Sequence, residues 1–280
     1  MNTRQFQSWL HNSRHSPLIM GILNLTPDSF SGDGLFMDVD KAVKHALILE
    51  KDGADIIDIG GESTRPGSES IDIQEELERV LPVIENLREQ TEMLISIDTY
   101  KAQVADQAIK AGADIINDIS GLMFDKQMAA ISVKHNAWVV IMHIKGTPKD
   151  MQVNPVYEDL IKELKEYFIT RINYAVAMGI SREKIIVDPG IGFGKKWRDN
   201  FILIRELSVF KELGLPILVG PSKKSFIGMA LDLPVDDRLE GTAAAVTASV
   251  LNGADIIRVH DVKAMSRVIK ISEMIKGNRS

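Results

Sequence analysis

The 280-residue sequence contains no cysteine. This absence excludes disulfide bonds, thiolate metal sites, iron–sulfur clusters and cysteine nucleophiles together, and it is typical of a protein in the reducing cytoplasm. Positive charge is not in excess either, because 33 Lys and Arg residues stand against 39 Asp and Glu residues, for a formal net charge of −6. The chain lacks the general positive field that suits nucleic acid or anionic membranes, so an anionic ligand must meet a local group of cations.

Long hydrophobic runs are also absent. No apolar stretch reaches the roughly 18 residues that a membrane span needs, and residues 1–17 contain no hydrophobic core of the signal-peptide kind. We therefore expect a cytoplasmic protein. The hydrophobic content is nevertheless 45%, which suffices for a sizeable core. Because no linker or low-complexity segment interrupts the chain, residues 1–280 are predicted to form a single domain.

One pentapeptide, Gly-Ala-Asp-Ile-Ile, occurs three times, at Gly53–Ile57, Gly112–Ile116 and Gly253–Ile257. Each copy follows a segment with the apolar periodicity of a helix. Glycine favours the position just past a helix, and a β-branched run favours a buried strand, so each copy predicts a helix-to-strand junction. The spacing of the copies fits two and then four strand–helix units of about 30 to 35 residues.

Eight short apolar runs bounded by turn-forming residues predict strands at Leu18–Leu23, Ile56–Ile59, Met93–Ile97, Ile115–Asn117, Trp138–Met142, Ile185–Val187, Ile217–Val219 and Ile256–Val259. Segments with helical periodicity lie between them, for example Asp40–Lys51, Gln74–Arg88, Tyr157–Met178 and Asn200–Leu213. Strict alternation of strand and helix predicts a parallel sheet covered by helices. Eight uninterrupted repeats favour the α/β fold of a closed (βα)8 TIM barrel over an open Rossmann sheet.

Polar side chains stand at the ends of these apolar strands. They are Asn24, Asp58 with Gly60, Gly61 and Glu62, Asp98, Asn117, Asp118, His143, Asp188, Lys223, Lys224, Arg258 and His260. In a TIM barrel the catalytic groups lie where the strands run into the loops that follow them. A solvated barrel rim explains any one of these residues, but it explains poorly why so many short amides, carboxylates and cations terminate buried strands.

Three segments after predicted strands carry further signals. Residues 24–34 combine turn formers with Phe30, which is typical of a loop that folds over a substrate. Residues 60–67 begin with two glycines and hold Arg65, which suits a carboxylate or phosphate. Residues 220–225 end one strand and open a helix, so backbone N–H groups and two lysines favour an anion there. Each pattern also occurs in ordinary turns and capped helices.

The glycine-rich residues 188–196 fit neither the dinucleotide-binding fingerprint nor the Walker loop in spacing, and we expect them to form the base of a lid. The strand-end residues are also compatible with a bound metal ion. Mg²⁺ typically takes one or two protein oxygens together with phosphate oxygens, so a substrate diphosphate would bring it in. Asn24 and Asp28 are the candidate ligands.

Together these motifs closely resemble those of the dihydropteroate synthase family of pterin-binding barrels, from about residue 18 to about residue 275. The resemblance rests on seven ordered segments near strand ends. They are Gly21–Phe30, Gly60–Gly67, Ser96–Thr99, Ile116–Ile119, Asp188–Lys195, Ser222–Ser225 and Ile257–Val262. Seven motifs in the right order at seven strand ends make a chance resemblance very improbable.

The resemblance implies a transferase of folate biosynthesis that joins 6-hydroxymethyl-7,8-dihydropterin diphosphate to 4-aminobenzoate and releases 7,8-dihydropteroate and pyrophosphate. It implies Mg²⁺ as cofactor, a dissociative substitution through a cation-like methylene, and competition by sulfonamides. It also implies a homodimer, for which apolar positions on the last two helices would supply the contact. The chemistry of the residues agrees with this function, because one edge of a pterin ring carries hydrogen-bond donors that match the acceptor atoms of Asp188 and Asn117.

The same resemblance assigns roles to individual residues. Catalysis is expected from Asp98, Lys224, Arg65 and Thr64. The pterin site is expected to contain Asp98, Asn117, Asp188, Lys224, Met142 and Phe193. The diphosphate is expected at Asn24, Arg258 and His260, with Asn24 also holding the metal. The aminobenzoate is expected among Phe30, Thr64, Arg65, Pro66, Phe193, Lys224 and Ser225.

Two positions depart from the family pattern. Lys223 stands where the family commonly has arginine, which keeps the charge but loses a planar, bidentate group. In the first loop, Gly32 and Asp33 stand in the reverse of the usual order, so the carboxylate is displaced by one residue. The second departure weakens any assignment of Asp33 to metal or diphosphate binding.

Three other interpretations remain. A methyltetrahydrofolate-binding, methyltransferase-type barrel would share the pterin acceptors, but Lys224, Arg258 and the loop at 64–66 favour diphosphate chemistry. A catalytically silent pterin-binding paralogue would not need the full polar set. A generic sugar-phosphate barrel would be expected to carry a Schiff-base lysine within a strand or a phosphate loop after the last two strands.

Overall fold

The computed structural model describes residues 1–12, 15–26, 38–65 and 67–277. The strands are β1 Leu18–Asn24, β2 Ile56–Gly60, β3 Leu94–Asp98, β4 Ile115–Asp118, β5 Trp138–Met142, β6 Ile185–Asp188, β7 Leu218–Val219 and β8 Ile256–Val259. The α-helices are α1 Thr3–Leu10, α2 Val39–Lys51, α3 Ile73–Arg88, α4 Ala102–Ala111, α5 Met128–His135, α6 Leu160–Ala177, α7 Trp197–Arg205, α8 Ser225–Leu231, α9 Leu239–Leu251 and α10 Val262–Lys276. Short 3-10 helices lie at Arg182–Lys184, Leu207–Leu213 and Val235–Asp237.

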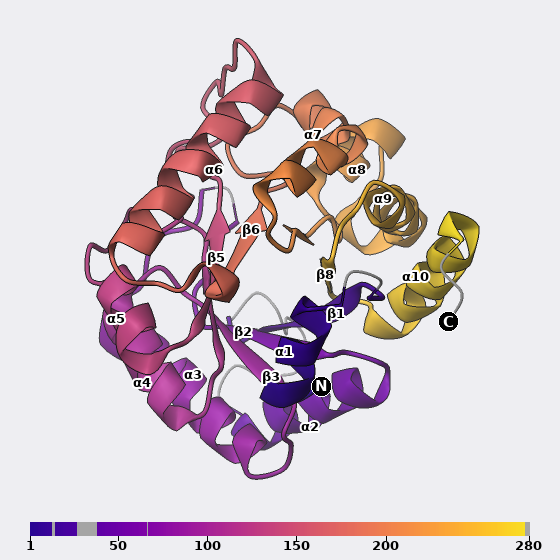
Figure 1. Ribbon diagram of the computed structural model, residues 1–280. Helices are drawn as coiled ribbons and strands as arrows, with labels where there is room; N and C mark the ends of the chain where they lie inside the picture. The colour runs from indigo at the N-terminus through magenta and orange to yellow at the C-terminus, as the bar shows by residue number, and fades with distance from the viewer. Residues whose placement is uncertain (13–14, 27–37, 66, 278–280) are drawn as a thin grey trace.

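The strands form one parallel sheet in the order β6-β5-β4-β3-β2-β1-β8-β7. Its two outer strands meet through a single bridge between Val187 and Ile217 and through a hydrogen bond from the Val187 N–H to the Pro216 carbonyl, 3.0 Å long. The sheet therefore closes into a barrel, and the helices surround it as an outer ring (Figure 1). The predicted (βα)8 fold is confirmed.

The helix α1, which the apolar pattern did not predict, closes one end of the barrel. Phe6 and Trp9 are buried, stack with ring centroids 5.5 Å apart, and pack against the first residues of the strands, including Trp138. The Met1 carbonyl accepts a hydrogen bond from the Leu94 N–H. Because α1 covers the end where the strands begin, a substrate site must lie at the opposite end, where the strands stop.

The predicted strand boundaries agree with the structure to within one residue at each end. Helix–strand junctions also form as predicted, because Gly53, Gly112 and Gly253 each adopt a positive φ, which glycine tolerates best. Across the described residues, no helix is long and apolar enough to cross a membrane.

Two predicted helices were partly wrong. Tyr157–Met178 begins only at Leu160, because the Asp159 carboxylate caps the helix by accepting the Lys162 N–H. Asn200–Leu213 is divided into α7 and a 3-10 helix. The Ile204 carbonyl accepts the side-chain amide of Asn252 at 2.9 Å, and this long-range contact helps to end α7.

Candidate active site

A layer of polar side chains lies across the carboxyl ends of β1 to β4. The strand register pairs Asn24 with Gly60, Gly60 with Asp98, and Asp98 with Asn117. Residues paired in neighbouring parallel strands direct their side chains to the same face of the sheet. A Cβ added at Gly60 would lie 3.5 Å from Asn24 Oδ1 and 3.7 Å from Asp98 Oδ2. The glycine therefore leaves space between an amide oxygen and a carboxylate.

Arg258 on β8 reaches across this layer to two carboxylates. Its Nε donates to Asp58 Oδ2 at 2.5 Å and one terminal nitrogen donates to Asp98 Oδ2 at 2.7 Å. Asn117 Nδ2 also donates to Asp58 Oδ2, at 3.0 Å. Burial raises the pKa of Asp98 to about 7, against the opposing effect of the Arg258 charge. The other oxygens, Oδ1 of Asp58 and Oδ1 of Asp98, are buried, and no group among the described residues donates to them.

Asp188 ends β6 on the opposite side of the barrel. Its Oδ1 accepts the Gly190 N–H at 2.7 Å, and no described residue donates to its Oδ2. Burial raises its pKa to about 6. Met142, its partner in the register with β5, is buried and packs with Phe193 in a small apolar cluster. The carboxylate therefore has one oxygen held by the backbone and one available to a ligand.

Lys224 lies between these acidic groups, immediately before α8. Its ammonium lies 4.2 Å from the centroid of the Phe193 ring, and its chain packs over Gly192. Burial and the nearby Arg258 lower the pKa of Lys224 to about 8, while the charges of Asp188 and Asp98 oppose that shift. The cation is placed where it can contact a polar ring or an anion.

The loop after β6 packs into the protein, contrary to the expectation that it forms the base of a lid. Lys195 is 1% exposed and its ammonium lies 2.9 Å from His143 Nδ1, 3.2 Å from the His143 carbonyl and 3.0 Å from the Phe193 carbonyl. A Cβ at Gly190 would lie 2.0 Å from the His143 carbonyl oxygen. Only glycine therefore permits this close approach of the loop to the end of β5.

His260 follows β8, beside Arg258. Its Nδ1 lies 3.0 Å from Ser222 Oγ, and its backbone N–H donates to the same oxygen. Burial and the neighbouring cations lower the pKa of His260 to about 3, so the imidazole is neutral near pH 7. Lys223 lies close by, with φ 55° and with its ammonium 3.1 Å from the carboxylate of Asp261. The cations Arg258, Lys223 and Lys224 thus gather at this rim.

The loop after β2 carries Thr64 and Arg65, both at least partly exposed. Ser68 closes the loop by donating from Oγ to the Ser63 carbonyl at 2.6 Å and from its N–H to the Arg65 carbonyl at 3.0 Å. The Gly67 N–H donates to the Pro148 carbonyl on the loop after β5. Two loops thus meet above the carboxyl end of the barrel.

The remaining predicted residues lie at the start of α8 or outside the described residues. Ser225 is exposed in the first turn of α8. Phe30 and Pro66, predicted to contact the aminobenzoate, lie outside the described residues, as do Asp28 and Asp33. Within the described residues, no three His, Asp or Glu side chains form a cluster that would hold a metal by itself.

Two residues of the site received no role from the sequence. Asp58 holds Arg258, and Lys195 holds the loop that carries Phe193. For Asp58 a signal was present, because an acidic residue stands inside the apolar run Ile56–Ile59 and is fully buried. For Lys195 the glycine-rich neighbourhood gave no indication of burial.

The family model for pterin binding enzymes matches residues 20–260. A dihydropteroate synthase from Synechocystis is 48% identical over 258 residues, which cover 92% of this chain and 89% of the relative. The chain belongs to the dihydropteroate synthase family. It is therefore an enzyme, a transferase of folate synthesis with a pterin-binding TIM barrel.

Solved dihydropteroate synthases share the whole fold. The Yersinia pestis enzyme in complex with a sulfonamide drug superposes with a TM-score of 0.90 at 42% identity, covering 94% of this chain and 95% of that one. The Xanthomonas albilineans enzyme with 4-aminobenzoic acid superposes with a TM-score of 0.87 at 40% identity, covering 93% of both chains.

Proposed function

We propose that this chain condenses 6-hydroxymethyl-7,8-dihydropterin diphosphate with 4-aminobenzoate, giving 7,8-dihydropteroate and pyrophosphate. The observation that carries the proposal is the arrangement of acids and cations at one end of the barrel. Arg258 is held between Asp58 and Asp98, and Lys224 lies near Asp188 at the same end of the barrel, opposite α1, which we call the opening. These groups fit an uncharged ring edge rich in donors together with an anionic leaving group.

The pterin ring is assigned to the side of the opening formed by Asp188, Asn117 and Lys224. Asp188 Oδ2 accepts from the amino and ring N–H groups of the pterin. Asn117 donates one amide hydrogen to Asp58, so its carbonyl oxygen remains available to the ligand. Lys224 donates to the ring carbonyl and to N5, while Met142 and Phe193 supply apolar walls.

The diphosphate is assigned to Asn24, Arg258 and His260. Arg258 supplies a fixed positive charge, since both of its carboxylate contacts hold the guanidinium at the opening. His260 contributes as a neutral donor, because the low pKa that burial imposes keeps it uncharged near pH 7. Preorganised donors of this kind stabilise a leaving anion without reorganisation at the moment of reaction.

A divalent cation fits the same place. The polar atoms around Gly60 are oxygens, from the Asn24 amide and the Asp98 carboxylate, and oxygen ligands suit Mg²⁺. We assign Asn24 as the protein ligand, with the diphosphate supplying further oxygens, because the described residues offer no group of three or more His, Asp or Glu side chains that could hold a metal. When bound, the metal would neutralise charge on the leaving group.

Bond breaking precedes bond making in the proposed reaction. The methylene C–O bond breaks and its electron pair leaves with pyrophosphate, which gives a methylene cation conjugated with the pterin nitrogens. The ionised carboxylate of Asp98 stabilises that cation. The aniline nitrogen then forms the C–N bond with its own lone pair and afterwards releases a proton. No strong base is needed, because an aniline amine is already neutral at pH 7.

The aminobenzoate is assigned to the entrance, between the loop with Thr64 and Arg65 and the start of α8 with Ser225. We assign Phe30 and Pro66, which lie outside the described residues, to the same slot. The Phe193 ring, which already contacts Lys224, forms the boundary between the two substrates. Closing of the entrance loops excludes water from the cation-like intermediate.

The decisive experiment is to measure pyrophosphate release from the dihydropterin diphosphate with and without 4-aminobenzoate. We expect release that depends on both substrates and on Mg²⁺, with 7,8-dihydropteroate formed in equal amount. Pyrophosphate release at the same rate with and without 4-aminobenzoate, or no release at all, would contradict the proposal.

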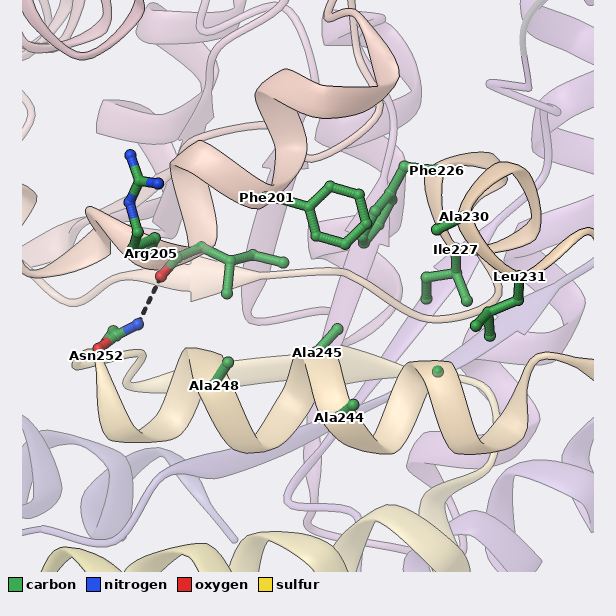
Figure 2. Close-up of a pocket in the computed structure, with 12 residues that line it drawn as sticks. Phe201, Arg205, Phe226, Ile227, Ala230, Leu231, Ala244, Ala245, Ala248 and Asn252 are labelled. Atoms are coloured by element: carbon green, nitrogen blue, oxygen red, sulfur yellow. Dashed lines mark hydrogen bonds between the residues drawn. The ribbon is translucent and has the colours of Figure 1, made fainter.

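We also propose that the chain is a cytoplasmic homodimer. A groove of about 410 Å³ lies between α7, α8 and α9, and its lining is largely apolar (Figure 2). Phe201 and Leu231 border it and are 43% and 49% exposed, and Met229 on α8 is 62% exposed. Exposed apolar area concentrated on one face favours burial against a second copy. On α10, Ile271, Met274 and Ile275 extend the exposed apolar surface of the last helices.

Sedimentation equilibrium tests the homodimer. The double substitution of Met229 and Leu231 by glutamate is expected to give a monomer, because it places charge in the proposed contact. Ile48→Glu on α2 is the matched control, since Ile48 is 52% exposed on another helix. A monomeric unmutated protein would refute the proposed assembly.

A further inference from the structure

A buried group of charges lies at the base of the loop after β2, beside the polar layer but not part of it. Lys101, just before α4, donates to Glu62 Oε2 at 2.5 Å, to Glu76 Oε2 at 2.6 Å and to the Ile71 carbonyl at 2.8 Å. Tyr100 donates from its hydroxyl to Glu62 Oε1. Glu62 and Glu76 are 9% and 1% exposed, so the two carboxylates and the ammonium are largely withdrawn from water.

The contacts hold both ends of one loop. Glu62 begins the segment that carries Thr64 and Arg65, and Ile71 ends it. The Ile71 N–H donates to Glu62 Oε2, while the Ile71 carbonyl accepts from Lys101. One ammonium therefore joins the two ends of the loop to each other and to the segment after β3.

The charge balance makes Lys101 necessary to this arrangement. Glu62 and Glu76 share a single ammonium, so their carboxylates lie on either side of it. Without that cation two buried carboxylates would face each other, and such a pair is relieved by protonation or by movement of one group. Glu76 is fixed in the first turns of α3, whereas Glu62 stands on a loop. The loop base is therefore the part that would move.

We propose that Lys101 and Glu62 are positioning residues that set where Thr64 and Arg65 stand over the aminobenzoate entrance. This inference rests on the proposed function of that entrance. Neither residue touches the reacting atoms. They act through the loop that carries Thr64 and Arg65, so a change in either residue is expected to alter the binding of 4-aminobenzoate. The pterin side, formed by Asp188 and Asn117, lies on other strands and keeps its geometry.

The test is steady-state kinetics on the full-length protein, with each substrate varied in turn. Lys101→Met is expected to raise KM for 4-aminobenzoate by about tenfold to a hundredfold, as a misplaced positioning group does. We expect KM for the pterin diphosphate to change less than about threefold. Lys101→Arg retains the cation and is expected to restore most of the affinity for 4-aminobenzoate.

Lys211→Met is the matched control. Lys211 also binds a buried carboxylate, with its ammonium 2.6 and 2.7 Å from the two oxygens of Asp255, but Asp255 precedes β8 at the other end of the barrel. This variant is expected to lose stability while keeping both KM values. If Lys101→Met does not yield folded protein, Glu62→Gln tests the same contacts with little change in volume.

The outcomes separate the two proposals. Unmutated protein that shows no release of pyrophosphate dependent on 4-aminobenzoate would refute the proposed function itself. If the unmutated protein is active but the variant of Lys101 or Glu62 changes both KM values equally, or neither, the positioning role is wrong. A selective rise for 4-aminobenzoate that Lys101→Arg reverses would support it.

Discussion

Replacing Asp188 by asparagine should remove most of the affinity for the pterin, and the structure explains the direction of the effect. The Gly190 N–H already occupies Oδ1 at 2.7 Å. An asparagine side chain must therefore turn its oxygen toward Gly190 and its NH2 group toward the ligand. The amide then presents a donor to the donor edge of the pterin.

The size of the loss in pterin affinity follows from the burial of residue 188 and the pterin edge that it contacts. Asp188 is 6% exposed, so water cannot repair the mismatch. A buried, unsatisfied polar group costs about 1–3 kcal/mol, which weakens binding by roughly 5- to 150-fold. Loss of the carboxylate charge adds to this cost, because Asp188 offsets the positive charges of Lys224, Lys195 and Arg258.

The assay is calorimetric titration of the dihydropterin diphosphate into each protein. Asp118→Asn is the matched control, because Asp118 also ends a strand and is fully buried, but its donors among the described residues lie in its own loop, at Ser120 and Leu122. We expect that control to lower the melting temperature and to leave the pterin affinity unchanged. An Asp188→Asn variant that binds the pterin as tightly as the unmutated protein would refute the assignment.

Three further outcomes are expected. The pH profile of kcat/KM should be bell-shaped, because activity needs an ionised Asp98, whose pKa is raised to about 7, and a charged Lys224, whose pKa is lowered to about 8. Lys224→Arg should remove the decline in activity at high pH, and a decline that persists in this variant would contradict the role of Lys224. Lys223→Arg should change turnover by less than about tenfold, since arginine keeps the charge opposite Asp261, and a larger loss in the same assay would reveal a role specific to lysine. Titration of a sulfonamide should show weak binding to the protein alone and tighter competitive binding with pterin, pyrophosphate and Mg²⁺ present, whereas equal affinities would mean that the slot is preformed.

The barrel was predictable because its signal is local. Strands of a parallel barrel are buried on both faces, so each reads as a short continuous apolar run. The repeated Gly-Ala-Asp-Ile-Ile segments mark three of the junctions, and Gly53, Gly112 and Gly253 all have the backbone that this pattern requires. The polar strand ends could be collected into one site because parallel strands all finish at the same end of the barrel.

Contacts between distant segments could not be predicted in the same way. Arg258 and Asp58 are 200 residues apart, and no local pattern records that the guanidinium turns to this carboxylate. Lys195 stands in a glycine-rich loop that resembles a surface segment, yet its ammonium is buried against His143, the residue after β5. The helix α1 was missed because Phe6 and Trp9 are its only buried residues, and their partners are distributed over all eight strands.

The joint between β6 and β7 has a consequence for how the barrel fluctuates. The other neighbouring strands are joined by ladders, whereas this joint has one bridge, and β7 is only two residues long. Backbone amides near Val187 and Ile217 should therefore exchange with solvent faster than those of β2 or β3. Asp188 and Lys224 stand on opposite sides of this joint. A bound pterin would contact both residues, stabilise the contact between β6 and β7, and so slow the exchange of these amides.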